Sequence, residues 1–294
     1  RESGKFNTIK TLPYEGTDTE FLGYIDTYSS SKILAMFKDS NEVKGLKEGD
    51  EGILILDKSP FYAESGGQVG DSGYIKTNDG KFYVQDTIKI KKNVFGHIGV
   101  LESGSLKCNE QVEALIDEHR RNDIKRNHSV THLLHKALKI ILGDHVEQKG
   151  SLVDNLKTRF DFSHTKPISN DEIQQIESIV NNEILTNKVT TTEMMSIDKA
   201  KESGALMLFG EKYDSEVRVL NIGNSIELCG GTHVSNTGDI GLFKIYSETG
   251  VASGVRRIEG VTGLNLIKFL NDQEEILTKV SKDLNTKPSE IPTK

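Results

Sequence analysis

Residues 126–138 have the sequence RNHSVTHLLHKAL, which combines a helical pattern with two histidines four residues apart. Apolar residues recur here at the three- and four-residue spacing of a helix face, so we predict a helix through this stretch. On that helix, His128 and His132 lie one turn apart on the same face. The two imidazoles are therefore presented side by side.

A second pair of metal-binding residues has the same spacing. Residues 228–234, LCGGTHV, place Cys229 and His233 around two glycines, which indicates a loop or a strand end. Zn²⁺ prefers imidazole nitrogen and thiolate sulfur in a tetrahedral arrangement. We predict that one zinc ion is bound by four side chains, those of His128, His132, Cys229 and His233. The alternative is a pair of solvated histidines and a buried thiol.

The composition describes a chain with a sizeable core. With 294 residues and 35% hydrophobic content, the length favours two domains over one. The longest apolar runs are far shorter than the roughly 20 residues that a membrane span needs, so no membrane segment is expected. The 2 cysteines predict no disulfide framework and indicate a reducing compartment, so we expect a cytoplasmic protein.

The charge balance argues against whole-surface binding to nucleic acid, because the formal net charge is −7. Basic residues nevertheless gather locally, either as solvated faces or as contacts for RNA. The three groups are Lys89, Lys91 and Lys92; Arg120, Arg121, Lys125 and Arg126; and Arg256 and Arg257.

The first 116 residues are rich in short β-prone segments with turn residues between them, which predicts a small β-barrel. Residues 21–27 and 33–37 are expected as strands on either side of a polar stretch, 29–31. A glycine-rich segment follows at residues 61–73, FYAESGGQVGDSG, and lacks the Lys-Ser/Thr of a phosphate-binding loop. Gly66 and Gly67 indicate positive φ or close backbone approach, with a plain connecting turn as the alternative.

From residue 117 the pattern becomes helical. A helix is expected to about residue 142, with Asp117 as N-cap and Gly143 beyond its end. A hairpin around Asp154-Asn155, a capping box at Ser169 opening a second helix, several strands and a helix from residue 264 follow. We expect an α+β fold, with a barrel domain at 1–116, an α+β zinc-binding domain with a mixed or antiparallel sheet at 117–263, and a C-terminal helical segment at 264–294.

Seven motifs resemble the editing region of alanyl-tRNA synthetase, in order and with matching gaps over essentially the whole chain. They are SPFYAESGGQVGDSG (59–73), NHSVTHLLHKAL (127–138), VEQKGS (146–151), RFDFSH (159–164), LFGEKY (208–213), ELCGGTHV (227–234) and GVRRIEGVTG (254–263). The histidine and cysteine pattern alone is also similar to the editing domain of threonyl-tRNA synthetase and to free-standing trans-editing proteins.

The resemblance implies a hydrolase that cleaves the aminoacyl ester of mischarged Ser-tRNA(Ala) and Gly-tRNA(Ala) and binds the tRNA(Ala) acceptor end. It also implies an excised piece, with synthetase domains missing at both ends and no ATP-binding motif for charging tRNA. It assigns catalytic roles to Gln148 and Cys229; Gln148 can also be an ordinary strand-end amide. It places Gly66, Gly67 and Gln68 at the mouth of the pocket.

Arg256 and Arg257 match the family's arginine pair and are expected to contact RNA, unless a structural salt bridge holds one of them. The role of zinc stays open, because four protein ligands close a tetrahedral site whereas catalytic zinc keeps one position open. Ser129 stands where a zinc peptidase carries its glutamate, which argues against a peptidase. The alternative function is a zinc-stabilised tRNA-binding module without hydrolytic activity.

Overall fold

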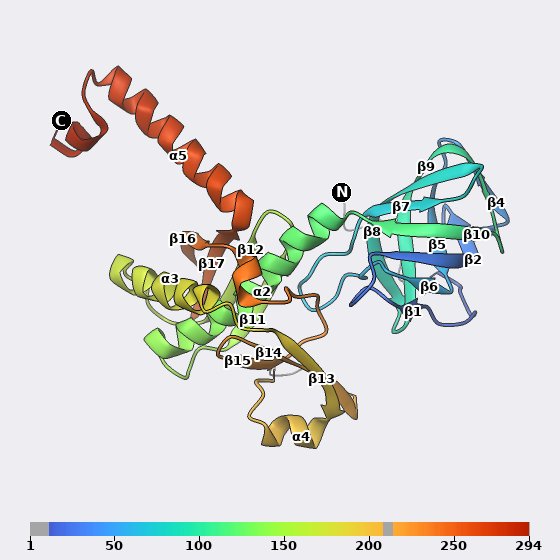
Figure 1. Cartoon of the computed structure of the whole chain (residues 1–294), viewed down its shortest axis with the longest axis horizontal. Helices are drawn as coiled ribbons and strands as arrows, with labels where there is room; N and C mark the ends of the chain where they lie inside the picture. The colour runs from blue at the N-terminus through green and yellow to red at the C-terminus, as the bar shows by residue number, and fades with distance from the viewer. Residues whose placement is uncertain (1–11, 208–213, 294) are drawn as a thin grey trace. The chain divides into compact units, whose positions relative to one another are not determined.

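The computed structural model describes residues 12–207 and 214–293, and its chain divides into two compact units (Figure 1). The first unit contains the described residues up to His128 together with Gly150–Asn155 and Cys229–His233. The second contains Ser129–Lys149, Leu156–Leu228 and the chain from Val234 onward. The division at residues 116 and 263 stays a prediction, and the LFGEKY motif lies outside the described residues.

A closed antiparallel barrel dominates the first unit (Figure 1). Its strands, in order around the barrel, are β2 (Tyr28–Lys38), β5 (Glu51–Leu56), β9 (Val94–Lys107), β8 (Gly80–Lys91), β7 (Gly73–Lys76) and β10 (Gln111–Ile116). The pairing of β10 with β2 closes the ring. Short strands β3 (Asn41–Val43) and β4 (Gly45–Lys47) pair with β2 and β9, and β1 (Glu20–Phe21) pairs with β6 (Lys58–Ser59). The expected barrel is confirmed.

Strand β2 departs from the prediction at its start. Only Glu20–Phe21 forms a strand in the region expected at residues 21–27, and β2 runs through the serines that were expected to separate two strands. Ser29 and Ser31 are buried, and their hydroxyl groups form a hydrogen bond of 2.7 Å. Their backbones pair with β10, so a partner distant in sequence stabilises a strand that local β-propensity does not favour.

Helix α2 (Glu118–Leu142) forms as predicted and carries the histidine pair. Asp117 Oδ1 accepts a hydrogen bond of 3.0 Å from the backbone N–H of Arg120, which is the contact of an N-cap. Gly143 has φ 113°, which fits its position directly after the helix end. The apolar stripe is buried at Ile124, Val130, Leu134 and Leu138.

In the described part of the chain, two sheets and three further α-helices complete the fold. One sheet has the order β11 (Gln148–Val153), β12 (Thr158–Ser163), β17 (Val255–Thr262), β16 (Phe243–Ala252), and the other has the order β13 (Thr191–Ser196), β14 (Glu216–Ile222), β15 (Ser225–Leu228). The helices are α3 (Asn170–Leu185), α4 (Ile197–Glu202) and α5 (Gly263–Asp283), with 3₁₀ turns η1 (Thr237–Ile240) and η2 (Pro288–Thr293). The capping box of Ser169 and Glu172 is present, and the α+β class is confirmed.

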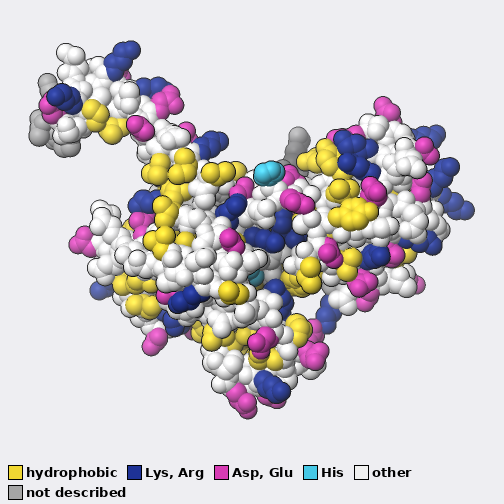
Figure 2. All heavy atoms as spheres, in the orientation of Figure 1, with side chains coloured by type: hydrophobic (Ala, Val, Ile, Leu, Met, Phe, Trp, Pro, Cys, Tyr) yellow, Lys and Arg dark blue, Asp and Glu magenta, His cyan; other side chains and the backbone are white. Residues whose placement is uncertain are grey.

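Helix α5 packs through its first turns and exposes apolar residues along the remainder. Leu266 is buried, and the rings of Phe269 and Tyr246 lie 5.9 Å apart. Hydrophobic side chains gather on the surface where α5 leaves β17 (Figure 2). Among the described helices, none combines the length and hydropathy needed to cross a membrane.

Candidate metal centre

Four metal-binding side chains come together at one point. His128 and His132 lie on α2, and Cys229 and His233 lie in the loop after β15. One ligand atom from each of them lies within 4.8 Å of the others. Cys229 Sγ is 3.5 Å from His128 Nε2 and 3.2 Å from His233 Nε2. The group can therefore hold a metal ion.

The donor set fits a cation that prefers nitrogen and sulfur. Imidazole and thiolate suit zinc, whereas magnesium and calcium prefer oxygen ligands. In a tetrahedral site with bonds of about 2.0 Å to nitrogen and 2.3 Å to sulfur, ligand atoms lie roughly 3.3–3.5 Å apart. Both Cys229 separations are near this value. Small movements are therefore enough to form the metal bonds.

Gln68 contacts the first helical ligand. Its side chain is fully buried, and its Oε1 lies 2.7 Å from His128 Nδ1. The same oxygen accepts a hydrogen bond of 2.9 Å from the backbone N–H of Thr232, and Gln68 Nε2 donates to Thr232 Oγ1 at 2.9 Å. The glutamine that the resemblance assigned to the pocket mouth therefore points inward, between α2 and the Cys229–His233 loop.

Glu227 holds His132, the second histidine of the helix. Sequence analysis did not identify this role of Glu227. His132 Nδ1 donates to Glu227 Oε2 at 2.7 Å, His135 Nδ1 lies 3.3 Å from Oε1, and Ser225 Oγ donates to Oε1 at 2.8 Å. Burial raises the pKa of the Glu227 carboxyl, but the facing His132 and His135 outweigh it and hold that pKa well below its usual range. The carboxylate fixes the His132 ring, as outer partners of metal-binding histidines commonly do. Its signal in the sequence is a lone acidic residue two positions before Cys229.

The glycines of the Cys229–His233 loop have different surroundings. A Cβ atom on Gly231 would overlap the His128 ring, whereas one on Gly230 would meet nothing nearer than 4.0 Å. The carbonyl of Gly230 accepts a hydrogen bond of 2.7 Å from the Tyr24 hydroxyl. Close approach of this loop to α2 therefore requires glycine at 231.

The glycine-rich segment makes a two-residue turn at its centre. The backbones of Ser65 and Gln68 exchange both hydrogen bonds, and Gly66 and Gly67 have φ 59° and 84°. A Cβ on Gly67 would press against the Ser151 carbonyl at 2.7 Å, whereas Gly66 has open space around it. The expected positive φ and close backbone approach are both present.

Two family models match the chain. One, described as tRNA synthetases class II (A), matches residues 2–120. The other, described as the threonyl and alanyl tRNA synthetase second additional domain, matches residues 217–259 and so includes Cys229, His233 and both arginines.

Curated relatives match at high identity across the chain. The alanine–tRNA ligase of Aromatoleum aromaticum is 54% identical over 291 residues, which cover 99% of this chain and 33% of that protein. That of Methylobacillus flagellatus is 53% identical over 291 residues, with 99% and 33% covered. That of Delftia acidovorans is 52% identical over 294 residues, with 100% and 34% covered. The chain belongs to the alanyl-tRNA synthetase family. It spans about a third of the length of these relatives.

Gln148, in the VEQKGS motif of the alanyl-tRNA synthetase family, lies at the start of β11. Its side chain is half-buried, and within the described part of the chain its amide makes no hydrogen bond. The amide therefore lies at the start of a strand and can bond a ligand.

The arginine pair of the alanyl-tRNA synthetase motif GVRRIEGVTG is held by carboxylates. Arg256 donates to both oxygens of Glu248 at 2.5 and 2.6 Å, and Arg257 donates to both oxygens of Asp161 at 2.7 and 2.8 Å. The structural salt bridge considered for one arginine therefore exists for both. Contact with RNA phosphate requires exchange of these carboxylates or sharing of the guanidinium groups.

Among the basic residues that precede His128 on α2, Arg121 is structural. Its guanidinium group is fully buried, pairs with Asp71 and also donates to the carbonyls of Gly23 and Pro60. Lys125, one turn before His128, is half-buried, and burial followed by the charge of Arg121 lowers its pKa.

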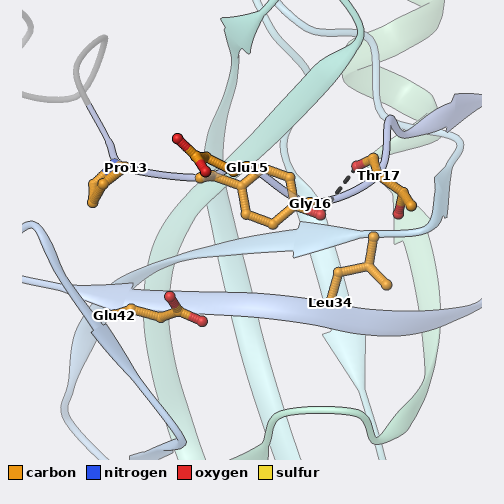
Figure 3. A pocket seen from close by; sticks show the side chains of 7 residues that line it. Pro13, Glu15, Gly16, Thr17, Leu34 and Glu42 are labelled. Atoms are coloured by element: carbon orange, nitrogen blue, oxygen red, sulfur yellow. Dashed lines mark hydrogen bonds between the residues drawn. The ribbon is translucent and has the colours of Figure 1, made fainter.

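A hollow of about 570 Å³ opens at the barrel wall, and none of its lining residues belongs to the metal centre (Figure 3). Tyr14, whose hydroxyl donates to the Thr17 carbonyl at 3.0 Å, lies in it. Glu15 and Glu42 supply the lining's charge, which is negative and does not suit the phosphates that an alanyl-tRNA synthetase binds.

Proposed function

We propose that the chain hydrolyses the aminoacyl ester of mischarged Ser-tRNA(Ala) and Gly-tRNA(Ala), with zinc bound by His128, His132, Cys229 and His233. The observation that supports this most directly is the gathering of four nitrogen and sulfur ligands in a member of the alanyl-tRNA synthetase family. Two of these side chains come from α2 and two from the loop after β15. The proposed substrate is the charged acceptor end of tRNA(Ala).

The chemistry of alanine selection explains why a second site is needed. A pocket for alanine cannot sterically exclude the smaller glycine, and one added hydroxyl group is rejected by only about 10²-fold where binding alone decides. A site that hydrogen-bonds the serine hydroxyl can discriminate in the opposite sense, because its buried polar group stays unpaired when alanine binds. Hydrolysis at such a site removes the wrong ester and leaves the right one.

Zinc bound by these residues supplies a positive charge that can act as a Lewis acid, lower the pKa of a water molecule, or position the substrate. The chain's own groups have separate tasks in this proposal. Gln68 and Glu227 hold the two helical imidazoles. Gln148 presents a side-chain amide with no hydrogen bond within the described residues, and we assign it to the aminoacyl group.

Binding of tRNA is proposed at the turn of Gly66 and Gly67 and at Arg256 and Arg257. The open space around Gly66 permits close approach of a backbone or sugar. The arginines are already paired with carboxylates, so their contribution to binding is expected to be small and sensitive to salt. We place the protein in the cytoplasm, a proposal supported by two cysteines that form no disulfide.

A second function is favoured by the number of ligands. Four protein ligands are typical of a structural zinc site, so the chain can instead be a zinc-stabilised tRNA-binding module without hydrolytic activity. The two functions make the same prediction for metal content and different predictions for ester cleavage.

The test is deacylation of Ser-tRNA(Ala) and of Ala-tRNA(Ala) by the same sample, with zinc measured in that sample. The proposed function predicts one zinc per chain and release of serine at a rate well above that of alanine. A zinc-loaded chain that binds tRNA(Ala) and releases serine only at the spontaneous rate would establish the binding module instead.

A further inference from the structure

We propose that Gln68, in the glycine turn of the barrel domain, is a positioning residue that fixes His128 in the tautomer and ring orientation needed to bind the metal. The inference rests on the metal centre of the proposed function. It moves Gln68 from the expected substrate-binding set to the support of a metal ligand.

The orientation of the Gln68 amide follows from its neighbours. A backbone N–H can only donate, so the Gln68 side-chain atom 2.9 Å from the Thr232 N–H must be the carbonyl oxygen. The amide nitrogen is then the atom that lies 2.9 Å from Thr232 Oγ1 and donates to it. Both ends of the amide are thus assigned by one backbone group, without reference to hydrogen positions.

The tautomer of His128 follows from this assignment. His128 Nδ1 lies 2.7 Å from the same carbonyl oxygen, which can only accept. Nδ1 must therefore carry a proton, and in the neutral ring Nε2 has the lone pair. Nε2 is the atom that lies 3.5 Å from Cys229 Sγ. Gln68 therefore turns the metal-binding nitrogen of His128 toward the thiolate.

The glycine turn holds Gln68 in place. Beyond the double hydrogen bond with Ser65, the Val69 N–H donates to the Val153 carbonyl at 3.1 Å, and Gln68 forms a parallel bridge with Val153. Gly67 passes so close to Ser151 that a side chain would collide with its carbonyl. The turn is therefore required in order to bring one amide to the ligand helix. This accounts for a glycine pair in a segment that lacks the features of a phosphate-binding loop.

The neutrality of the Gln68 side chain, which contacts His128, also has a physical reason. A divalent cation, the Cys229 thiolate and the Glu227 carboxylate sum to zero formal charge, and the neutral amide of Gln68 leaves that sum unchanged. A carboxylate at 68 would keep the acceptor oxygens but add a buried negative charge. Gln68→Glu therefore keeps an acceptor that orients the His128 ring and strengthens the attraction for the cation. Gln68→Met keeps a side chain of similar shape but removes the acceptor that orients the ring.

The experiment compares Zn²⁺ and Co²⁺ affinity in the wild-type chain, Gln68→Met, Gln68→Glu and the control Gln85→Met, which makes the same change on an exposed barrel position. We expect Gln68→Met to bind Zn²⁺ about 10- to 100-fold more weakly and to alter the visible spectrum of bound Co²⁺. Gln68→Glu should match or exceed wild-type affinity, and Gln85→Met should equal wild type. A general packing defect would instead weaken both Gln68 variants.

Nitrogen NMR of the metal-free wild-type chain provides a measurement that needs no variant. The His128 ring should carry its proton on Nδ1. A ring protonated on Nε2, or a Gln68→Met chain with wild-type affinity and an unchanged Co²⁺ spectrum, would overturn the inference. A wild-type chain that binds neither metal would overturn the metal centre itself, and the inference with it.

Discussion

The candidate centre depends on single residues whose neighbours are defined at the atomic scale. His128 has a neutral amide behind it and His132 a carboxylate, so two ligands from one motif have different outer partners. Sequence spacing predicted the pairing of His128 and His132 because helical periodicity is local, and the structure gathers them with Cys229 and His233 into a group that could hold a metal ion. Sequence spacing did not identify Glu227 or the role of Gln68, because each contacts a histidine more than fifty positions away.

Gly231 offers a matched test of the close approach between the cysteine loop and α2. In Gly231→Ala the added methyl group overlaps the His128 ring, so we expect metal affinity to fall by roughly 10-fold or more. Gly230→Ala adds the same group in open space and should leave affinity unchanged. Zinc titration of both variants checks this. Equal affinities in the two variants would contradict the described loop geometry.

Arg256 and Glu248 test whether the arginine pair contacts RNA. If Arg256 binds a phosphate, Arg256→Ala should weaken tRNA(Ala) binding and reduce the salt slope by roughly 0.7 for one lost contact with a single strand. Glu248→Gln removes the competing carboxylate and should strengthen binding. Affinity measured at several salt concentrations distinguishes these outcomes. If neither variant changes the slope, Arg256 is structural.

The elements differ in how well local sequence determines them. α2 and α3 were predicted with their caps, because Asp117, Ser169 and Glu172 act on backbone groups within one turn. β2 was not predicted through its serines, and β17, which carries both arginines, was not recognised as a strand. These strands are stabilised by pairing with β10, β12 and β16, and such partners leave no signal in the strand itself.

The barrel contains one fully buried group, His97, and one half-buried group, Asp86, whose protonation should affect stability with opposite sign. His97 is fully buried between Ser59 and the Leu54 carbonyl, and burial lowers its pKa from 6.5 to about 4. Below pH 6.5 the His97 ring binds a proton in the unfolded chain but stays neutral in the folded chain. The free energy of unfolding therefore falls as the pH drops from 6.5 to about 4. For Asp86, burial raises the pKa from 3.8 to about 6, so the folded chain takes up its proton first and stability rises as pH falls from 6 to 3.8.

The free energy of unfolding, measured in urea at pH 7.5 and at pH 5, gives the contribution of each group when the wild-type chain is compared with a variant that lacks that group. Relative to His97→Gln, the wild-type chain should lose about 2 kcal/mol on acidification. Relative to Asp86→Asn, it should gain about 1 kcal/mol over the same range. Differences of the same sign for both groups would contradict the burial described for them.

At the scale of the whole molecule, the centre is assembled from segments that are far apart in the chain. The glycine turn near residue 67, α2 and the loop at 229–233 meet through Gln68 and Thr232. The net charge of −7 argues against general RNA binding, and Arg121, Arg256 and Arg257 are each paired with a carboxylate. Recognition of tRNA is therefore expected to be local, at the acceptor end, and to depend on the metal centre for its chemistry.

The Cys229→Ala variant tests the central claim most directly, by single-turnover deacylation of Ser-tRNA(Ala) with zinc content and tRNA affinity measured on the same sample. Cys229 supplies the only thiolate of the group and lies in a loop outside the helices and strands, so its loss should remove zinc while the fold persists. We predict a deacylation rate lower by roughly 100-fold or more, with tRNA binding nearly unchanged. A variant that has lost zinc and still releases serine at the wild-type rate would contradict the account.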